Sequence, residues 1–174
     1  MREKIFKGKR LDNGQWVKGC LIIDYITGQY FIHADGFSVN ESDKVNEEGC
    51  LKFLAFEIDP ETVCEYTSKT DRNGNEIFEG DIVAFYYGHN KDICEVVFEN
   101  GAFGLGVGIS KKFDYDELET SVYNATENYD NFVGCDNFIS LWEIAWNYNE
   151  YIDENLHLIE VIGNKYDNPE LLED

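Results

Sequence analysis

The residue types that most often carry chemistry, histidine and cysteine, are widely spaced in this chain. Its three histidines, His33, His89 and His157, have no cysteine or histidine close to them in sequence. The five cysteines include no Cys-x-x-Cys pair, and no His-Glu-x-x-His signature occurs. We therefore expect no metal site and no cofactor. The cysteines are expected to be buried as small apolar side chains, with a reactive cysteine as the alternative. His89 lies in a predicted loop over residues 87–91 and is the histidine to test.

A series of oxygen-bearing side chains, Asp71, Asn73 and Asn75, matches the first three ligand positions of a calcium-binding EF-hand loop. The match then fails, because Glu76 stands where glycine is needed and Ile82 stands where a bidentate glutamate is needed. The segment also contains an Asn-Gly pair, which is typical of a hairpin turn. We interpret it as a turn.

Glycines alternate with apolar residues at Gly104, Gly106 and Gly108. A nucleotide-binding loop with such glycines needs a helix after it to hold the phosphates, and the sequence that follows has no helical pattern. A period of two fits better and predicts a strand whose glycines share one face. Such a bare face allows either close packing or the approach of a ligand, and both alternatives remain open at this point.

A group of aromatic residues in the last third of the chain is the best candidate for a contact surface. Four apolar residues at helical spacing predict a short helix over residues 136–148: Phe138, Leu141, Trp142 and Ala145. We expect Trp142 to pack against the rest of the fold. Tryptophan and tyrosine are enriched in binding hot spots, because they combine a large area with a polar tip. The predicted partner-binding residues are Trp146, Tyr148, Tyr151 and His89.

The chain is strongly acidic, with a formal net charge of −21. Residues 1–20 hold six Lys or Arg and two Asp or Glu, a net of +4, whereas residues 113–174 hold one Lys and sixteen acids, a net of −15. A negative field of this size repels phosphates, so direct binding of nucleic acid is not expected. A protein partner with a basic surface is the natural complement. The alternative is an acidic surface that only keeps the protein soluble.

The sequence also carries expectations about membranes. It has no run of about 18 apolar residues, and its N-terminus lacks the apolar core of a signal peptide. We therefore expect a cytoplasmic protein that does not contact a membrane.

Short runs rich in Val, Ile, Phe and Tyr, separated by turn signals, predict an all-β protein with few short helices. The expected strands cover residues 4–11, 15–23, 29–33, 51–57, 82–87, 93–99, 103–109 and 157–162. Asn-Gly and Asp-Gly pairs favour type I′ hairpin turns, and they occur at Asn13-Gly14, Asp35-Gly36, Asn73-Gly74 and Asn100-Gly101. Residues 110–135 have little periodicity and are expected to form a long loop or an edge excursion. Asn168-Pro169-Glu170 predicts a helical turn at the C-terminus.

Five blocks of sequence agree at once with the pattern of one known family. They are Pro60-Glu61-Thr62-Val63, the turn from Asp71 to Ile77, Glu79-Gly80-Asp81-Ile82-Val83, Asn100-Gly101-Ala102-Phe103 and the C-terminal block from Val161 to Leu172. On these blocks the chain resembles the YopX family. The resemblance implies an N-terminal β-sandwich-like region, residues 1–65, and an SH3-like barrel, residues 66–174, with an acidic insertion near residues 110–155. It also implies an origin in a phage or prophage and no established biochemical activity.

These observations lead to three hypotheses of function. The first is a phage or prophage accessory protein without catalytic activity, which binds another protein or assembles with copies of itself. The second is an acidic mimic of nucleic acid, which occupies the basic groove of a host DNA-binding or RNA-binding protein. The third is a small-ligand-binding protein or an enzyme that uses the glycine-bare strand and His89.

Overall fold

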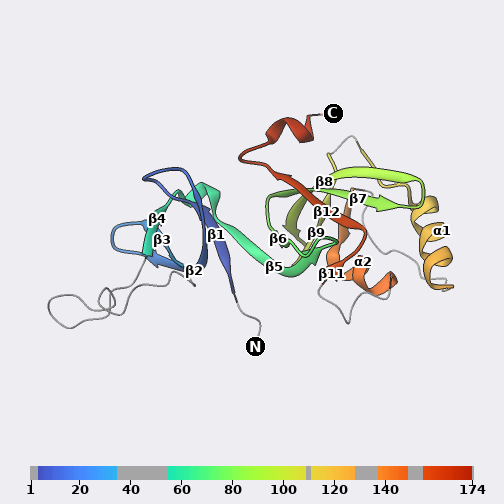
Figure 1. The fold of residues 1–174 in the computed structure, drawn as a ribbon, viewed down its shortest axis with the longest axis horizontal. Helices are drawn as coiled ribbons and strands as arrows, with labels where there is room; N and C mark the ends of the chain where they lie inside the picture. The colour runs from blue at the N-terminus through green and yellow to red at the C-terminus, as the bar shows by residue number, and fades with distance from the viewer. Residues whose placement is uncertain (1–3, 35–54, 109–110, 128–136, 149–154, 174) are drawn as a thin grey trace. The chain divides into compact units, whose positions relative to one another are not determined.

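A computed structural model describes residues 4–34, 55–108, 111–127, 137–148 and 155–173. These residues are mostly in β-strands, with two short α-helices, so the all-β prediction is confirmed (Figure 1). The described strands form two sheets and neither is closed, so the finer prediction of an SH3-like barrel is not confirmed. The chain divides into two compact units, Met1–Tyr66 (unit 1) and Thr67–Asp174 (unit 2). Within the described residues, no helix is both long enough and apolar enough to cross a membrane.

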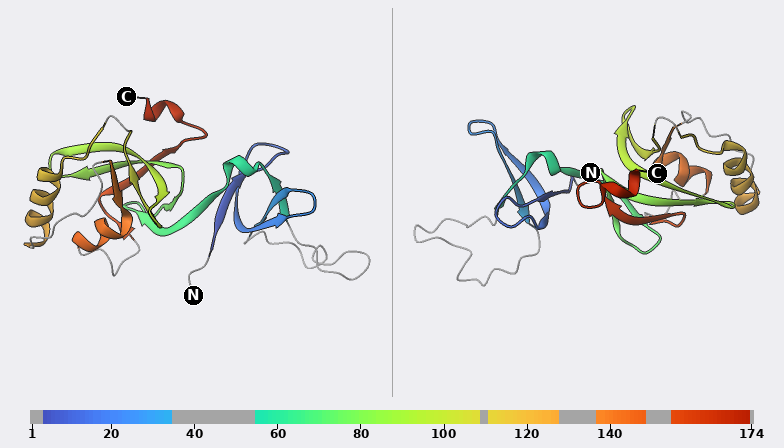
Figure 2. Two further views of the ribbon diagram at one scale, coloured as in Figure 1. Left: turned by 180° about the vertical axis from the view of Figure 1, so that it is seen from behind. Right: turned by 90° about the horizontal axis from the view of Figure 1, so that it is seen from above.

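Unit 1 is an antiparallel sheet that curls on itself (Figure 2). Its strands are β1 (Phe6–Lys9), β2 (Trp16–Asp24), β3 (Gln29–Ala34), β4 (Ala55–Ile58) and the start of β5 (Cys64–Asp71), with the 3-10 turn η2 (Pro60–Thr62) before β5. An isolated bridge between Arg10 and Ile58 brings the end of β1 back to β4. The alternation of side chains along the strands buries a small core of Val17, Ile32, Ala34 and Ile58.

Unit 2 is built on a five-stranded antiparallel sheet in the order β10-β9-β8-β7-β12. These strands are β7 (Asp81–Tyr87), β8 (Asn90–Glu99), β9 (Ala102–Gly106), β10 (Phe138–Ser140) and β12 (Ile159–Asn164). The rest of β5 pairs with β6 (Glu76–Phe78) and, in parallel, with β11 (Asn155–Leu156). The helical elements are α1 (Tyr115–Thr126), α2 (Leu141–Asn147) and the 3-10 turn η3 (Pro169–Leu172).

The larger hydrophobic core lies in unit 2. Phe85 is at its centre, with ring centroids 4.9 Å from Tyr87 and 6.2 Å from Phe113. Both helices contribute buried side chains to this core, Leu118 from α1 and Ile144 from α2. The core therefore fixes which face each helix leaves exposed.

Three of the predicted hairpin turns lie where the sequence placed them. Only Asn100-Gly101 has positive φ at both central residues, 52° and 84°, as a type I′ turn requires. In Asn13-Gly14 and Asn73-Gly74 only the glycine is left-handed. Asp35-Gly36 lies outside the described residues.

The prediction of a loop or edge excursion over residues 110–135 is wrong, because helix α1 lies within this segment. Asp114 caps the helix by accepting a hydrogen bond from the backbone N–H of Glu117 at 3.1 Å. Leu118 and Val122, one turn apart, are its buried side chains. Two apolar positions among so many acids give too narrow a stripe to be detected as helical periodicity.

The helix predicted over residues 136–148 begins only at Leu141. Phe138–Ser140 instead form strand β10, which pairs with β9. Ser140 then caps α2 by accepting a hydrogen bond from the backbone N–H of Glu143 at 3.1 Å. The Ser-x-x-Glu spacing of a capping box marked this boundary in the sequence. The predicted C-terminal turn is present as η3, although the Asn168 side chain makes no capping hydrogen bond to it.

A buried carboxylate, Asp71, joins a hairpin turn to strand β12. Its oxygens accept hydrogen bonds from the backbone N–H groups of Asn73 and Asn75, each at 2.8 Å, and from the Asn75 side chain at 3.0 Å. They also accept a hydrogen bond from the backbone N–H of Val161 at 3.0 Å, ninety residues away. The turn interpretation of Asp71, Asn73 and Asn75 is therefore confirmed. These side chains organise the backbone.

Asp81 makes a second connection of the same kind. Its buried carboxylate accepts hydrogen bonds from the backbone N–H of Phe78 at 2.8 Å and from the side-chain amide of Asn164 at 3.0 Å. Asn164 in turn accepts a hydrogen bond from the backbone N–H of Tyr166 at 3.0 Å. The C-terminal block of unit 2 is thus held by polar contacts inside the fold.

We expect Asp71→Asn to lower the free energy of unfolding by about 3 kcal/mol, because an amide cannot accept the same hydrogen bonds. Burial by itself raises the pKa of Asp71, but the hydrogen bonds from Val161 and Asn75 outweigh it and hold the pKa below the ordinary 3.8. The stabilisation is therefore complete above that value and is lost as the pH falls through the lowered pKa. Guanidinium unfolding at neutral and acidic pH should show a shallower acid dependence in the variant.

The control for this prediction is Asp24→Asn. Asp24 also accepts backbone hydrogen bonds in a turn, from Ile26 and Thr27, but these hydrogen bonds are exposed to solvent, so its replacement should change the free energy of unfolding little. Equal acid dependence in the wild type and Asp71→Asn would contradict a structural role for the charge.

Candidate functional site

Helix α2 presents two exposed tryptophans, one helical turn apart. Trp142 and Trp146 are 60% and 51% exposed, and their ring centroids lie 5.9 Å apart. The prediction that Trp142 packs against the fold is therefore wrong. The reason is that Leu141, Ile144 and Ala145 occupy the buried face of this short helix, which leaves the other face to the tryptophans.

Tyr148 ends α2 and is half-buried. Its hydroxyl donates a hydrogen bond to Oγ of Ser121 on α1 at 2.9 Å. The same Ser121 oxygen accepts a hydrogen bond from the backbone N–H of Gly88, in the turn between β7 and β8, at 3.1 Å. Ser121 therefore joins three elements: both helices and the hairpin turn.

His89 lies in the same hairpin turn and is exposed. The turn contacts α1 through the His89 backbone, because its N–H donates a hydrogen bond to Oε1 of Glu117 at 2.9 Å. Gly88 has a φ of 52°, and a Cβ at this position would lie 1.9 Å from the same Glu117 oxygen. The left-handed backbone and this close contact both favour glycine here, and α1 lies directly against the tip of the hairpin.

The structure thus places three of the four predicted residues, Trp146, Tyr148 and His89, on elements that α1 connects. The fourth, Tyr151, lies outside the described residues. Sequence reasoning missed Glu117 and Ser121 because they lie in the segment predicted to be a loop. The Asp-x-x-Glu spacing that begins at Asp114 was the signal that could have revealed the helix.

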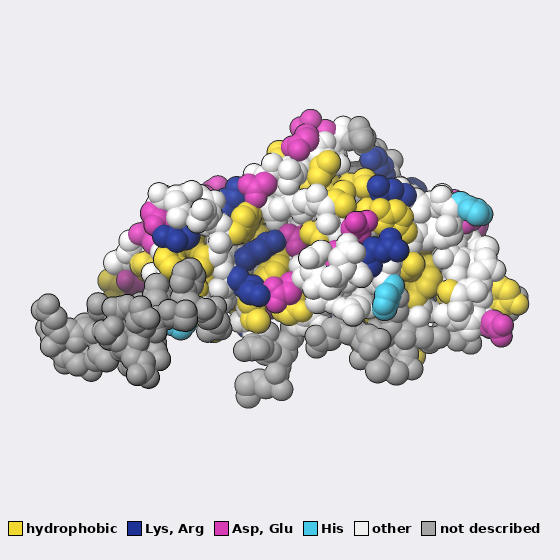
Figure 3. Space-filling view, viewed as in Figure 1, with side chains coloured by type: hydrophobic (Ala, Val, Ile, Leu, Met, Phe, Trp, Pro, Cys, Tyr) yellow, Lys and Arg dark blue, Asp and Glu magenta, His cyan; other side chains and the backbone are white. Residues whose placement is uncertain are grey.

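The connecting helix α1 is acidic. The helix and its two caps carry five acids and no Lys or Arg: Asp114, Asp116, Glu117, Glu119 and Glu127. On the face seen in Figure 3, acidic side chains lie among largely uncharged ones at the right of the view, where α1 lies. A negative surface of this kind attracts cationic partners, and the attraction weakens as salt is added.

Among the described residues, few side chains are suited to thiol chemistry or to metal binding. Burial, together with the nearby Asp92, raises the pKa of the Cys94 thiol, so it is held neutral, and Cys64 is buried as well. Cys20 is exposed, contrary to the expectation of buried cysteines. In the part of the chain that the structure describes, no three His, Cys, Asp or Glu side chains lie close enough to hold a metal ion.

We expect Ser121→Ala to lower the free energy of unfolding by about 1 kcal/mol, because its oxygen accepts two hydrogen bonds from other elements. The amide hydrogen of Gly88 should also exchange faster with solvent. The matched control is Thr120→Ala on the same helix, whose hydroxyl donates only to the Asp116 carbonyl of α1 itself. Unchanged exchange at Gly88 in Ser121→Ala would show that Ser121 does not join these elements.

Comparisons with known proteins give one family. A family model described as "YopX protein" matches residues 15–173. Among solved structures, the YopX protein of Bacillus subtilis is 17% identical with a TM-score of 0.47, over 97% of each chain. A protein of Enterococcus faecalis is 18% identical with a TM-score of 0.42, over 99% of each chain. No curated protein matches significantly.

Proposed function

We propose that this chain, which belongs to the YopX family, is a non-catalytic protein that binds another protein. The family has no characterised function, so the proposal depends on the surface of unit 2. The observation that carries it is the pair of exposed tryptophans on α2, Trp142 and Trp146.

Exposing two large aromatic side chains is costly in water. Full burial of a large apolar side chain contributes roughly 1.5–3 kcal/mol, which these two residues partly forgo in the described structure. Their rings lie near each other on a helix whose other face is fixed in the core, so they are held in place before any partner arrives. A rigid aromatic pair loses little conformational entropy on binding, and this favours its use as an interface anchor.

The proposed partner has a basic surface. Helix α1 carries five acids with its caps, and Ser121 joins it to the end of α2 through Tyr148. Charge on α1 would then steer a cationic partner, whereas the tryptophans would supply most of the affinity. We further propose an accessory role in a phage or prophage, in the cytoplasm of the host bacterium. The family resemblance supports this proposal.

We expect Trp142→Ala/Trp146→Ala to weaken binding of the partner by about 30-fold or more, equivalent to ~2 kcal/mol. The test captures partners from host lysate on tagged protein at low and high salt, identifies them, and measures each purified partner by calorimetry. Affinity for the wild type should fall as salt is raised.

The matched control is Tyr25→Ala/Ile26→Ala. These two residues are also large and exposed, at 89% and 96%, but they lie in the turn between β2 and β3 of unit 1. Loss of binding in this control, with none in the tryptophan variant, would contradict the assignment of the site. If the tagged protein captures only copies of itself, self-assembly would replace the proposed binding of another protein. A nucleic-acid-binding partner released by salt would favour the nucleic-acid mimic.

A further inference from the structure

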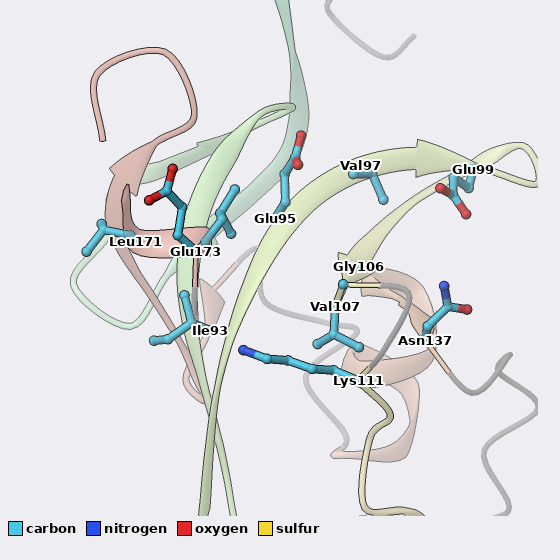
Figure 4. A pocket seen from close by; sticks show the side chains of 12 residues that line it. Ile93, Glu95, Val97, Glu99, Gly106, Val107, Lys111, Asn137, Leu171 and Glu173 are labelled. Atoms are coloured by element: carbon cyan, nitrogen blue, oxygen red, sulfur yellow. The ribbon is translucent and has the colours of Figure 1, made fainter. Parts of the chain in front are cut away.

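A groove with a volume of about 420 Å³ lies in unit 2, over the face of β8 that points away from the core (Figure 4). Cys94 and Val96 of β8 face the core, whereas Ile93, Glu95 and Val97 line the groove. Lys111 and the residues of η3 and its C-cap contribute further lining. The volume is in the range of pockets that bind ligands, roughly 300–1,000 Å³.

The glycines of the 103–109 segment explain why this surface is hollow. A Cβ at Gly104 would lie 2.3 Å from the Phe138 ring, so this glycine allows close packing. A Cβ at Gly108 would meet nothing within 4 Å, and Gly106 and Gly108 both line the groove. Both alternatives that the sequence left open therefore apply, at different glycines of this segment: close packing at Gly104, within β9, and an open surface at Gly108, beyond the end of β9.

The lining has a repeating chemistry. Same-face residues of a strand lie about 6.8 Å apart, and along β8 they alternate between apolar and acidic: Ile93, Glu95, Val97 and Glu99. Glu173 adds a third carboxylate, whereas Lys111 is the one cation among the lining residues described. Lys165 pairs with Glu95 at 3.0 Å, so part of the negative charge already has a partner.

We propose that this groove binds an extended peptide segment of a partner protein, with apolar and basic side chains alternating on the face that enters the groove. An extended peptide repeats its same-face side chains at the spacing of β8, so its apolar residues meet Ile93 and Val97 while its lysines or arginines meet Glu99 and Glu95. The site shares no residue with the tryptophan pair of α2, and it does not depend on the proposed function.

The probe is a fluorescein-labelled heptapeptide, Val-Ser-Lys-Ser-Val-Ser-Lys, and fluorescence anisotropy measures its Kd. The same peptide with glutamate in place of lysine should bind at least about tenfold more weakly. The peptide with serine in place of valine should also bind more weakly, because apolar contacts to Ile93 and Val97 are lost. In heteronuclear NMR spectra, the amide signals of Gly106 and Gly108 should shift as the first peptide is added.

Two variants test the site in different ways. Gly108→Trp fills the groove, and the open space at this position lets the fold accept the side chain. Glu99→Lys/Glu173→Lys reverses two charges of the lining and remains informative if the first variant does not fold. Each variant should weaken binding of the peptide by about tenfold or more. The matched control Glu119→Lys/Glu127→Lys makes the same charge change on and beside α1 and should retain binding.

Three outcomes would overturn the proposal. If Glu99→Lys/Glu173→Lys and Glu119→Lys/Glu127→Lys weaken binding equally, the peptide is attracted only by the net charge of the protein. Unchanged binding in Gly108→Trp would mean that the peptide lies elsewhere. A wild-type dimer that dissociates in Gly108→Trp without peptide would make a second copy of the chain the occupant. Trp142→Ala/Trp146→Ala should bind the peptide normally, so this proposal and the proposed function fail separately.

Discussion

The buried carboxylates of Asp71 and Asp81 are the constraint on which the rest of unit 2 depends. A carboxylate away from water is stable only if its oxygens are fully occupied, and here the donors come from far along the chain. Val161 donates to Asp71, and Asn164 donates to Asp81. The blocks that carry the family resemblance therefore meet inside the fold. Their Asp, Asn and Gly residues hold turns and strands together, which gives these motifs a structural role.

With the C-terminal block fixed in this way, the segment between β9 and β11 carries the acidic helix and the tryptophan pair of unit 2. Helix α1 closes over the β7–β8 turn through Glu117 and Ser121, and α2 buries one face in the core. The surface features of unit 2 are an acidic helix, a pair of exposed tryptophans and a groove over β8, beside a strand whose glycines leave one face without side chains. We interpret these features as binding surfaces on a rigid support.

Local signals in the sequence predicted most of the strands and turns, because each depends on a few adjacent residues. Strands β5, β6, β10 and β11 were not predicted. Short runs rich in Val, Ile, Phe and Tyr indicated β7 and β8, period-two alternation indicated β9, and the Asn-Gly pairs marked the hairpins. Helix α1 escaped prediction because its apolar face consists of little more than Leu118 and Val122. The exposure of Trp142 and the joining role of Ser121 also could not be predicted, since both depend on contacts between segments distant in sequence. The groove could be predicted only in part. The glycine spacing indicated a strand face without side chains, but it did not show which of the glycines is closely packed.

Photocrosslinking in the host bacterium would test the central claim, that a partner protein binds the exposed face of α2, most directly. A benzophenone amino acid would replace Trp146, and in a second strain it would replace Tyr25 in unit 1. The account predicts a crosslinked adduct at position 146, formed with a protein that presents a basic surface, and none at position 25. Adducts at position 25 alone, or equal adducts at both positions, would contradict it.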